Sequence, residues 1–149
     1  MVQVGVIGSG NCDGELFSIA ERVGEILAER GCIVINGGLG GVMEASAKGA
    51  RRKGGTVIGI LPTADKKYAN PYVSVTIATN MGHARNMIIV HSSDALIAIG
   101  GEYGTISEMA IALKEGKRVV AIQPPVVLPG LIVAETPEEA VEKALEGFE

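Results

Sequence analysis

The sequence predicts one α/β domain with a doubly wound parallel sheet, covered by helices on both faces in three layers. Its 149 residues match the usual size of one domain. Apolar runs typical of strands alternate with helical patterns along the whole chain, as in successive βαβ units. Apolar residues make up 47% of the chain and aromatic residues only 3%, so Val, Ile, Ala and Leu must build the core, as in parallel strands buried on both faces. We therefore expect residues 1–149 to form a single domain.

The first half of the chain predicts three strands and two helices in alternation. Short apolar runs predict the strands, at residues 2–7, 32–35 and 56–61. Between the first two strands, apolar residues spaced three and four apart predict a helix that ends at Gly31. A second helix is expected over residues 42–52, because basic residues precede two glycines at its end, as the helix dipole favours. Residues 62–72 are polar and contain prolines, so we expect a long exposed loop there and consider it a candidate lid.

The second half continues the alternation. Strands are expected at residues 73–78, 95–99, 118–122 and, as a short edge strand, 131–133. Helical patterns cover residues 81–91 and 106–115. The run Thr136-Pro137-Glu138-Glu139 combines an N-cap, a first-turn proline and an N3 glutamate, which predicts the start of the last helix. We expect the first and fourth strands to lie side by side at the centre of the sheet, because the chain reverses direction after residue 72.

Composition and charge exclude several classes of protein. The net charge of −4 opposes broad binding of nucleic-acid phosphates. The first apolar run follows no basic segment, and three prolines interrupt the longest uncharged stretch, residues 119–134, so we expect a cytoplasmic protein with no membrane contact. Cys12 and Cys32 lie too far apart for a CxxC motif, and no metal site is predicted. We interpret both cysteines as buried small residues, with a reactive Cys12 as the alternative.

Three glycine clusters follow directly after three predicted strands. Their candidate ligand-binding residues are Gly8, Ser9, Gly10, Gly37, Gly38, Gly40, Gly41, Gly100, Gly101 and Gly104. The carboxyl ends of parallel strands share one edge of a sheet, so these loops should converge there, each before a helix N-terminus that suits an anion. Any one cluster could merely permit a tight turn, but three together predict a phosphate site. An anion is expected between residues 37–41 and 100–105, held mainly by backbone N–H groups.

Two common nucleotide motifs are missing. The residues after Gly8-Ser9-Gly10 depart from GxGxxG, and Asn36 stands where a dinucleotide-binding fold places a ribose-binding carboxylate. The chain also contains no GxxxxGK[ST] sequence. Ordinary NAD binding is therefore disfavoured, and a P-loop NTPase is excluded.

Side chains at the same predicted edge complete the candidate site. Arg85 lies in the first turn of a predicted helix, a position where an arginine is unfavourable unless an anion or carboxylate accompanies it. Thr79 and His83 precede it at the same edge, and together with Thr105 they are further candidate ligand-binding residues. The run Thr105-Ile106-Ser107-Glu108 matches a capping box, in which Glu108 reaches back to the backbone of Thr105. The alternative is that Glu108 faces the ligand. We therefore take Arg85 and Glu108 as candidate catalytic residues.

Three motifs carry a resemblance to a known family: Gly82-His83-Ala84-Arg85-Asn86, the run from Ser93 to Gly101, and Gly104-Thr105-Ile106-Ser107-Glu108. Together they resemble the signature of the LONELY GUY cytokinin-activating enzymes, often labelled lysine decarboxylase-like, and residues 37–44 resemble that family's earlier glycine-rich motif. The chain departs from the enzymes at four places. Asn86 stands where they have lysine, Ile99 replaces a proline, Ser107 replaces the first of two glutamates, and one residue is added between the glycine pairs. These variants are more similar to the molybdenum-cofactor-carrier branch of the superfamily.

The resemblance implies a Rossmann-like fold, a homodimer or higher oligomer, and a small phosphate-bearing ligand. It does not imply lysine decarboxylation, because no lysine lies in a recognisable pyridoxal phosphate motif. One function is a protein that binds a nucleotide or molybdopterin-type cofactor by its phosphate. The alternative is a nucleoside 5′-monophosphate phosphoribohydrolase, in which Arg85 and the backbone at Gly40 and Gly104 hold phosphate and ribose while Glu108 stabilises an oxocarbenium-like transition state.

The departures at Asn86 and Ser107 favour the binding protein. A more distant likeness to the DNA-processing protein A fold raises single-stranded nucleic-acid binding as a third function. Aromatic residues on which bases could stack are few, at 3% of the chain, so we disfavour it.

Overall fold

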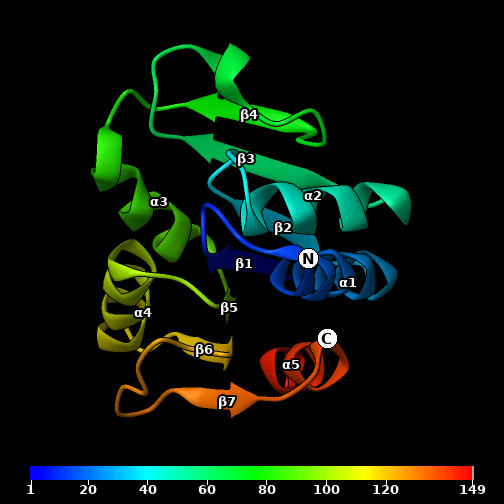
Figure 1. The fold of residues 1–149 in the computed structure, drawn as a ribbon, viewed down its shortest axis with the longest axis vertical. Helices are drawn as coiled ribbons and strands as arrows, with labels where there is room; N and C mark the ends of the chain where they lie inside the picture. The colour runs from blue at the N-terminus through cyan, green and yellow to red at the C-terminus, as the bar shows by residue number, and fades with distance from the viewer. Residues whose placement is uncertain (149) are drawn as a thin grey trace.

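A seven-stranded sheet forms the centre of the computed structural model, which describes residues 1–148 (Figure 1). Its strands are β1 (Gln3–Gly8), β2 (Ile33–Asn36), β3 (Val57–Leu61), β4 (Val75–Ala78), β5 (Ala95–Ile99), β6 (Arg118–Ile122) and β7 (Ile132–Ala134). They lie in the order β4-β3-β2-β1-β5-β6-β7, and every neighbouring pair is parallel. The central strands are buried on both faces, which explains their near-continuous Val, Ile and Ala content.

Helices cover both faces of the sheet and confirm the three-layer α/β prediction. The helices are α1 (Gly14–Glu29), α2 (Val42–Arg52), α3 (Arg85–Ser92), α4 (Tyr103–Lys114) and α5 (Pro137–Leu145), with short 3-10 turns η1 (Lys66–Tyr68) and η2 (Gly82–Ala84). The first core cluster joins the sheet to α1, α2 and α5, and the second joins it to α3 and α4. Within residues 1–148, no helix has the length and apolar character needed to span a bilayer.

The predicted order of the strands was wrong. The fourth strand, β4, lies at the edge of the sheet, and β5 is the neighbour of β1 on the side away from β2 (Figure 1). The chain adds β2, β3 and β4 outward in one direction and then returns across the other face through α3 to start β5. The reversal therefore comes after β4, and the switch point lies between β1 and β5.

The long segment between β3 and β4 takes the place of a crossover helix. Asn70 fastens it to the loop after β2, because its backbone N–H donates to Gly38 O at 2.8 Å and its Nδ2 donates to Leu39 O at 2.9 Å. Tyr72 packs against the core cluster on the α1 and α2 side. The candidate lid is therefore a connection that supports the glycine loop after β2.

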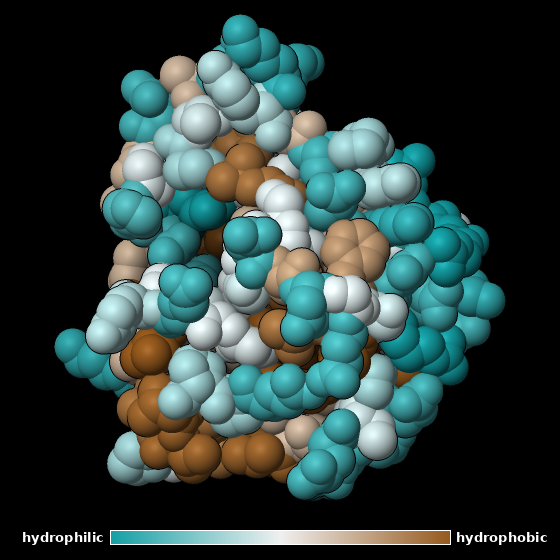
Figure 2. All heavy atoms as spheres, in the orientation of Figure 1, coloured by the Kyte–Doolittle hydropathy of each residue, from teal (hydrophilic) through white to brown (hydrophobic). Residues whose placement is uncertain are grey.

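An apolar region covers α4 and the connection between β6 and β7, where hydrophobic atoms gather at the lower left of Figure 2. Leu113 of α4 and Leu128 line a shallow hollow there, and Val127 is 66% exposed. Met109 and Ala112 of α4 do not contribute to this region, because both pack fully buried against the sheet.

Candidate functional site

A cavity of about 380 Å³ opens at the carboxyl edge of the sheet, at the switch point between β1 and β5. Its volume is within the range of small-molecule sites. Nine of the predicted site residues line it, namely Gly8, Ser9, Gly10, Gly37, His83, Arg85, Gly104, Thr105 and Glu108. The structure adds Val6, Ile7, Asn11, Met43, Asn86, Ile89 and Glu102 to the lining. The convergence of separate loops at one edge, which the parallel topology predicts, thus brings these residues together.

The other six predicted residues, which are Gly38, Gly40, Gly41, Thr79, Gly100 and Gly101, are not among the lining residues. Thr79 closes the turn after β4, since its Oγ1 donates to Leu61 O at 2.7 Å and accepts from Met81 N at 3.2 Å. Gly101 has a φ of +117°, and a Cβ there would lie 2.5 Å from the side chain of Thr105. This glycine is therefore needed for the turn into α4.

Gly8 allows the first loop to pass close to β5. A Cβ at Gly8 would lie 2.1 Å from Ile99 O, so only glycine fits there. The next residue joins the loops together: Ser9 N–H donates to Ile99 O at 3.2 Å, and Ser9 O accepts from Val42 N at 2.9 Å. The backbone around the cavity is thus held by hydrogen bonds between neighbouring loops.

The N-terminus of α4 is open to the cavity. Glu102 is the N-cap but makes no side-chain capping bond, and the first backbone bond of this turn runs from Ile106 N–H to Glu102 O at 3.0 Å. The N–H groups of the three residues before Ile106 therefore lack intrahelical acceptors, and two of those residues, Gly104 and Thr105, line the cavity. By contrast, the start of α1 is closed by Asp13, which accepts from Leu16 N at 2.9 Å.

Arg85 acts as a bridge between elements. Its Nη1 donates to Gly37 O at 2.7 Å and to Ile60 O at 2.6 Å, which ties the start of α3 to the loop after β2 and to β3. Its Nε donates to Asn86 Oδ1 at 2.9 Å. Within residues 1–148, Nη2 makes no hydrogen bond to protein, so this nitrogen is the part of the guanidinium left to meet a ligand. Burial lowers the pKa of Arg85, an effect that Glu108 opposes.

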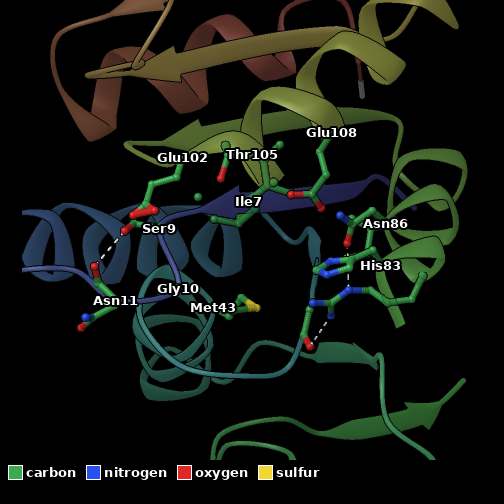
Figure 3. A pocket seen from close by; sticks show the side chains of 16 residues that line it. Ile7, Ser9, Gly10, Asn11, Met43, His83, Asn86, Glu102, Thr105 and Glu108 are labelled. Atoms are coloured by element: carbon green, nitrogen blue, oxygen red, sulfur yellow. Dashed lines mark hydrogen bonds between the residues drawn. The ribbon is translucent and has the colours of Figure 1, made fainter. Parts of the chain in front are cut away.

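Glu108 is a buried carboxyl that faces the cavity (Figure 3). The predicted capping box was wrong, because α4 begins at Tyr103, and Thr105 therefore lies inside the helix. Glu108 is only 8% exposed, and burial raises its pKa from 4.5 to about 7, against the lowering effect of Arg85. Near neutral pH this carboxyl can therefore gain or lose a proton, as a general acid or base requires.

The two ends of the cavity differ in character. Figure 3 shows Ser9, Asn11 and Glu102 toward one end and His83, Asn86 and Glu108 toward the other. Sequence reasoning noted Asn86 only as a departure from a motif and missed its contact with Arg85. The sequence signal for this contact was that Asn86 directly follows Arg85 in the chain.

Neither cysteine lines the cavity. Cys32 is buried as predicted, but the prediction was wrong for Cys12, which is partly exposed; burial, with Asp13 as a smaller cause, raises the pKa of the Cys12 thiol. Burial likewise raises the pKa of Cys32. This disfavours the reactive alternative for Cys12. In the part of the chain that the structure describes, no group of three or more His, Cys, Asp or Glu residues could hold a metal ion.

The parallel sheet and the polar cavity at its switch point define a Rossmann-like α/β protein with a candidate ligand site. The chain belongs to the SLOG cluster4 family, whose model matches residues 1–146. An uncharacterised protein of Archaeoglobus fulgidus is 66% identical over 141 residues, which are 95% of this chain and 93% of that protein. A cytokinin riboside 5′-monophosphate phosphoribohydrolase of Mycobacterium tuberculosis is 32% identical over 119 residues, 74% of this chain and 64% of the enzyme. The chain thus spans less than two thirds of that enzyme's length.

Solved structures of similar fold include two proteins connected with the molybdenum cofactor. The molybdenum cofactor binding protein of Rippkaea orientalis matches with a TM-score of 0.91 and 34% identity over 95% of this chain and 94% of that protein. The molybdenum cofactor carrier protein of Chlamydomonas reinhardtii matches with a TM-score of 0.88 and 31% identity, covering 98% of each chain. The resemblance to LONELY GUY enzymes and to molybdenum cofactor carriers is confirmed.

Proposed function

We propose that the protein binds a phosphate-bearing nucleotide or pterin-type cofactor in this cavity and holds it without converting it. The observation that carries the proposal is the open N-terminus of α4, which places against a cavity of about 380 Å³ the N–H groups of Gly104 and Thr105, for which residues 1–148 supply no acceptor. A helix N-terminus of this kind binds phosphate through its N–H groups and its dipole. A Cβ at Gly104 would meet no atom within 4 Å, so a ligand can approach the backbone there.

The first loop supplies further donors on the same side. Among the described residues, the backbone N–H groups of Gly10 and Asn11 donate to no protein acceptor, and both residues line the cavity. At the opposite end lie Arg85 Nη2 and the polar side chains of Asn86 and Glu108. This donor set suits a phosphate at one end and a polar ring at the other, as in a nucleotide or a pterin phosphate. The similarity to molybdenum cofactor carriers over nearly the whole chain supports the same class of ligand.

A phosphoribohydrolase is the second candidate, and Glu108 is the observation that favours it. A buried carboxyl with a pKa of about 7 could stabilise a developing ribosyl cation or orient water. Against this candidate, Asn86 replaces the lysine of the similar enzymes with a neutral amide, which accepts a hydrogen bond from Arg85. Ser107, which replaces a glutamate, is exposed on the outer side of α4.

Titration calorimetry with nucleoside monophosphates and the matching nucleosides tests the proposal. We expect the monophosphates to bind at least about tenfold more tightly, because the phosphate is the anchor. Equal affinity for both would refute it. Mass spectrometry of ligand released from purified, denatured protein would identify what the protein holds, and robust release of free base from a monophosphate would favour the hydrolase instead.

A further inference from the structure

We call the end of the cavity lined by His83, Asn86 and Glu108 the ring end. The carboxyl of Glu108 there receives no hydrogen bond from the described protein. Glu108 is 8% exposed, and within residues 1–148 no side-chain or backbone donor forms a hydrogen bond to its carboxyl oxygens. Arg85 influences it by charge but forms no ion pair with it. Glu108 lines the cavity, so its carboxyl oxygens are reached from the cavity and a ligand bound there can supply the donors.

The neighbouring amide has its orientation determined by Arg85. Asn86 Oδ1 accepts from Arg85 Nε at 2.9 Å, so the amide nitrogen Nδ2 remains available as a donor. Figure 3 shows the Asn86 side chain and the Glu108 carboxyl facing the same part of the cavity. The ring end therefore offers N–H donors from Asn86 and from Arg85 Nη2, beside a carboxyl that accepts.

We infer that this end of the cavity recognises the 2-amino-4-oxopyrimidine edge that guanine and pterin rings share. Such an edge presents a ring N–H and an amino group side by side, which can donate two parallel hydrogen bonds to the two oxygens of Glu108. Its oxo group accepts from Asn86 Nδ2 or Arg85 Nη2. The inference rests on the proposed function, because the phosphate of the same ligand occupies the other end.

An adenine edge fits less well. It presents one amino donor and one ring-nitrogen acceptor, so it satisfies an ionised carboxylate at only one oxygen and requires Glu108 to be protonated for the second bond. The other charged or titratable groups that line the cavity are Arg85, His83 and Glu102, while β1 contributes only apolar residues beside Gly8. Burial raises the pKa of Glu108 to about 7, so both forms of the carboxyl exist near neutral pH.

The preference for guanine should therefore depend on pH. Two N–H donors stabilise the ionised carboxylate, so the ratio of GMP affinity to AMP affinity should rise as pH increases from 6 to 8. The ratio is the useful quantity, because both nucleotides carry the same phosphate and any titration of that phosphate cancels.

The experiment measures the affinities of GMP, AMP, IMP and 6-hydroxymethylpterin phosphate by calorimetry at pH 6 and pH 8. IMP lacks the 2-amino group and so isolates one of the two donors. We expect GMP or the pterin phosphate to bind at least about tenfold more tightly than AMP and IMP at pH 8. Whichever of GMP and the pterin phosphate binds more tightly identifies the ring that the site prefers.

Glu108→Gln tests the residue directly, because glutamine retains one acceptor oxygen and loses the other. At pH 8 the variant should lose at least about tenfold in affinity for the preferred ring and lose none for AMP, because the amide offers the acceptor and the donor that an adenine edge needs. Glu115→Gln, at an exposed position at the C-terminal end of α4, is the matched control and should keep the wild-type ratio. If Glu108→Gln does not fold, the pH dependence of the wild-type ratio still tests the inference.

The outcomes separate the inference from the proposed function. If all the monophosphates bind equally well, and more tightly than nucleosides, the inference is wrong and the proposed function stands. If no phosphorylated probe binds more tightly than its unphosphorylated counterpart, the proposed function is wrong and the inference falls with it.

Discussion

Glu108→Gln should stabilise the protein at alkaline pH and leave its stability nearly unchanged in acid. The variant keeps the shape of the side chain and removes the negative charge. Burial raises the pKa of Glu108 from its ordinary value of 4.5 to about 7. The folded state therefore holds the Glu108 proton between these pH values while the unfolded chain releases it, and the free energy of unfolding falls as pH rises through this range.

The size of the effect follows from the two pKa values. At about 1.4 kcal/mol for each pKa unit, the rise to about 7 corresponds to about 3 kcal/mol of stability, fully lost above pH 7 and fully retained below pH 4.5. The 8% exposure of Glu108 means that solvent screens this penalty little. The glutamine variant avoids the penalty, so it should be more stable than wild type by up to about 3 kcal/mol at pH 8.

Urea unfolding of ligand-free wild type and variant at pH 5 and pH 8 measures this difference. Glu115→Gln removes an exposed charge from the same helix and should change the free energy of unfolding by less than about 0.5 kcal/mol at both pH values. The reasoning would be refuted if Glu108→Gln changed the stability equally at pH 5 and pH 8.

Three further predictions concern the hydrogen bonds of Arg85, the packing of α2 against α1, and the oligomeric state. Arg85→Ala should lower the free energy of unfolding, measured in urea, by about 2–4 kcal/mol, because the carbonyls of Gly37 and Ile60 lose their shared donor. A change below about 0.5 kcal/mol would show that the hydrogen bonds of Nη1 contribute little. Gly49→Ala should lower Tm markedly, because its Cβ would lie 1.9 Å from a backbone oxygen of α1. The control Gly14→Ala should leave Tm nearly unchanged, because no atom lies within 4 Å of the new Cβ. Light scattering at tens of micromolar protein should report a dimer or larger oligomer. Val127→Asp places a charge on the apolar region over α4 and should shift the protein toward monomer. A monomeric wild type would contradict the prediction.

Local patterns in the sequence were sufficient for most of the secondary structure. Strands at residues 95–99 and 118–122 and the helix at 42–52 were predicted with the bounds that the structure has, because each is a short apolar or amphipathic run with clear end signals. The position of the candidate site was also predictable from the sequence. In a parallel sheet, glycine clusters that follow strands must converge at one edge, wherever each strand lies.

The order of the strands was decided only in the tertiary structure. Strand runs do not encode whether the next connection continues outward or returns, and here a segment with only a short 3-10 turn carried β4 to the sheet edge. Periodicity placed the residues of α3 and α4 on helices but not the first residue of either helix, which depends on how the preceding glycines turn.

The sequence by itself determined the α/β class, the Val- and Ile-rich core and the sheet edge at which the candidate site lies, because these follow from composition and spacing along the chain. The tertiary structure decided that Glu108 is a buried cavity group and that Arg85 bridges three elements. Burial and hydrogen bonding depend on distances between segments far apart in the sequence, such as the 48 positions that separate Arg85 from Gly37. Those distances exist only once the strands are ordered and the helices packed.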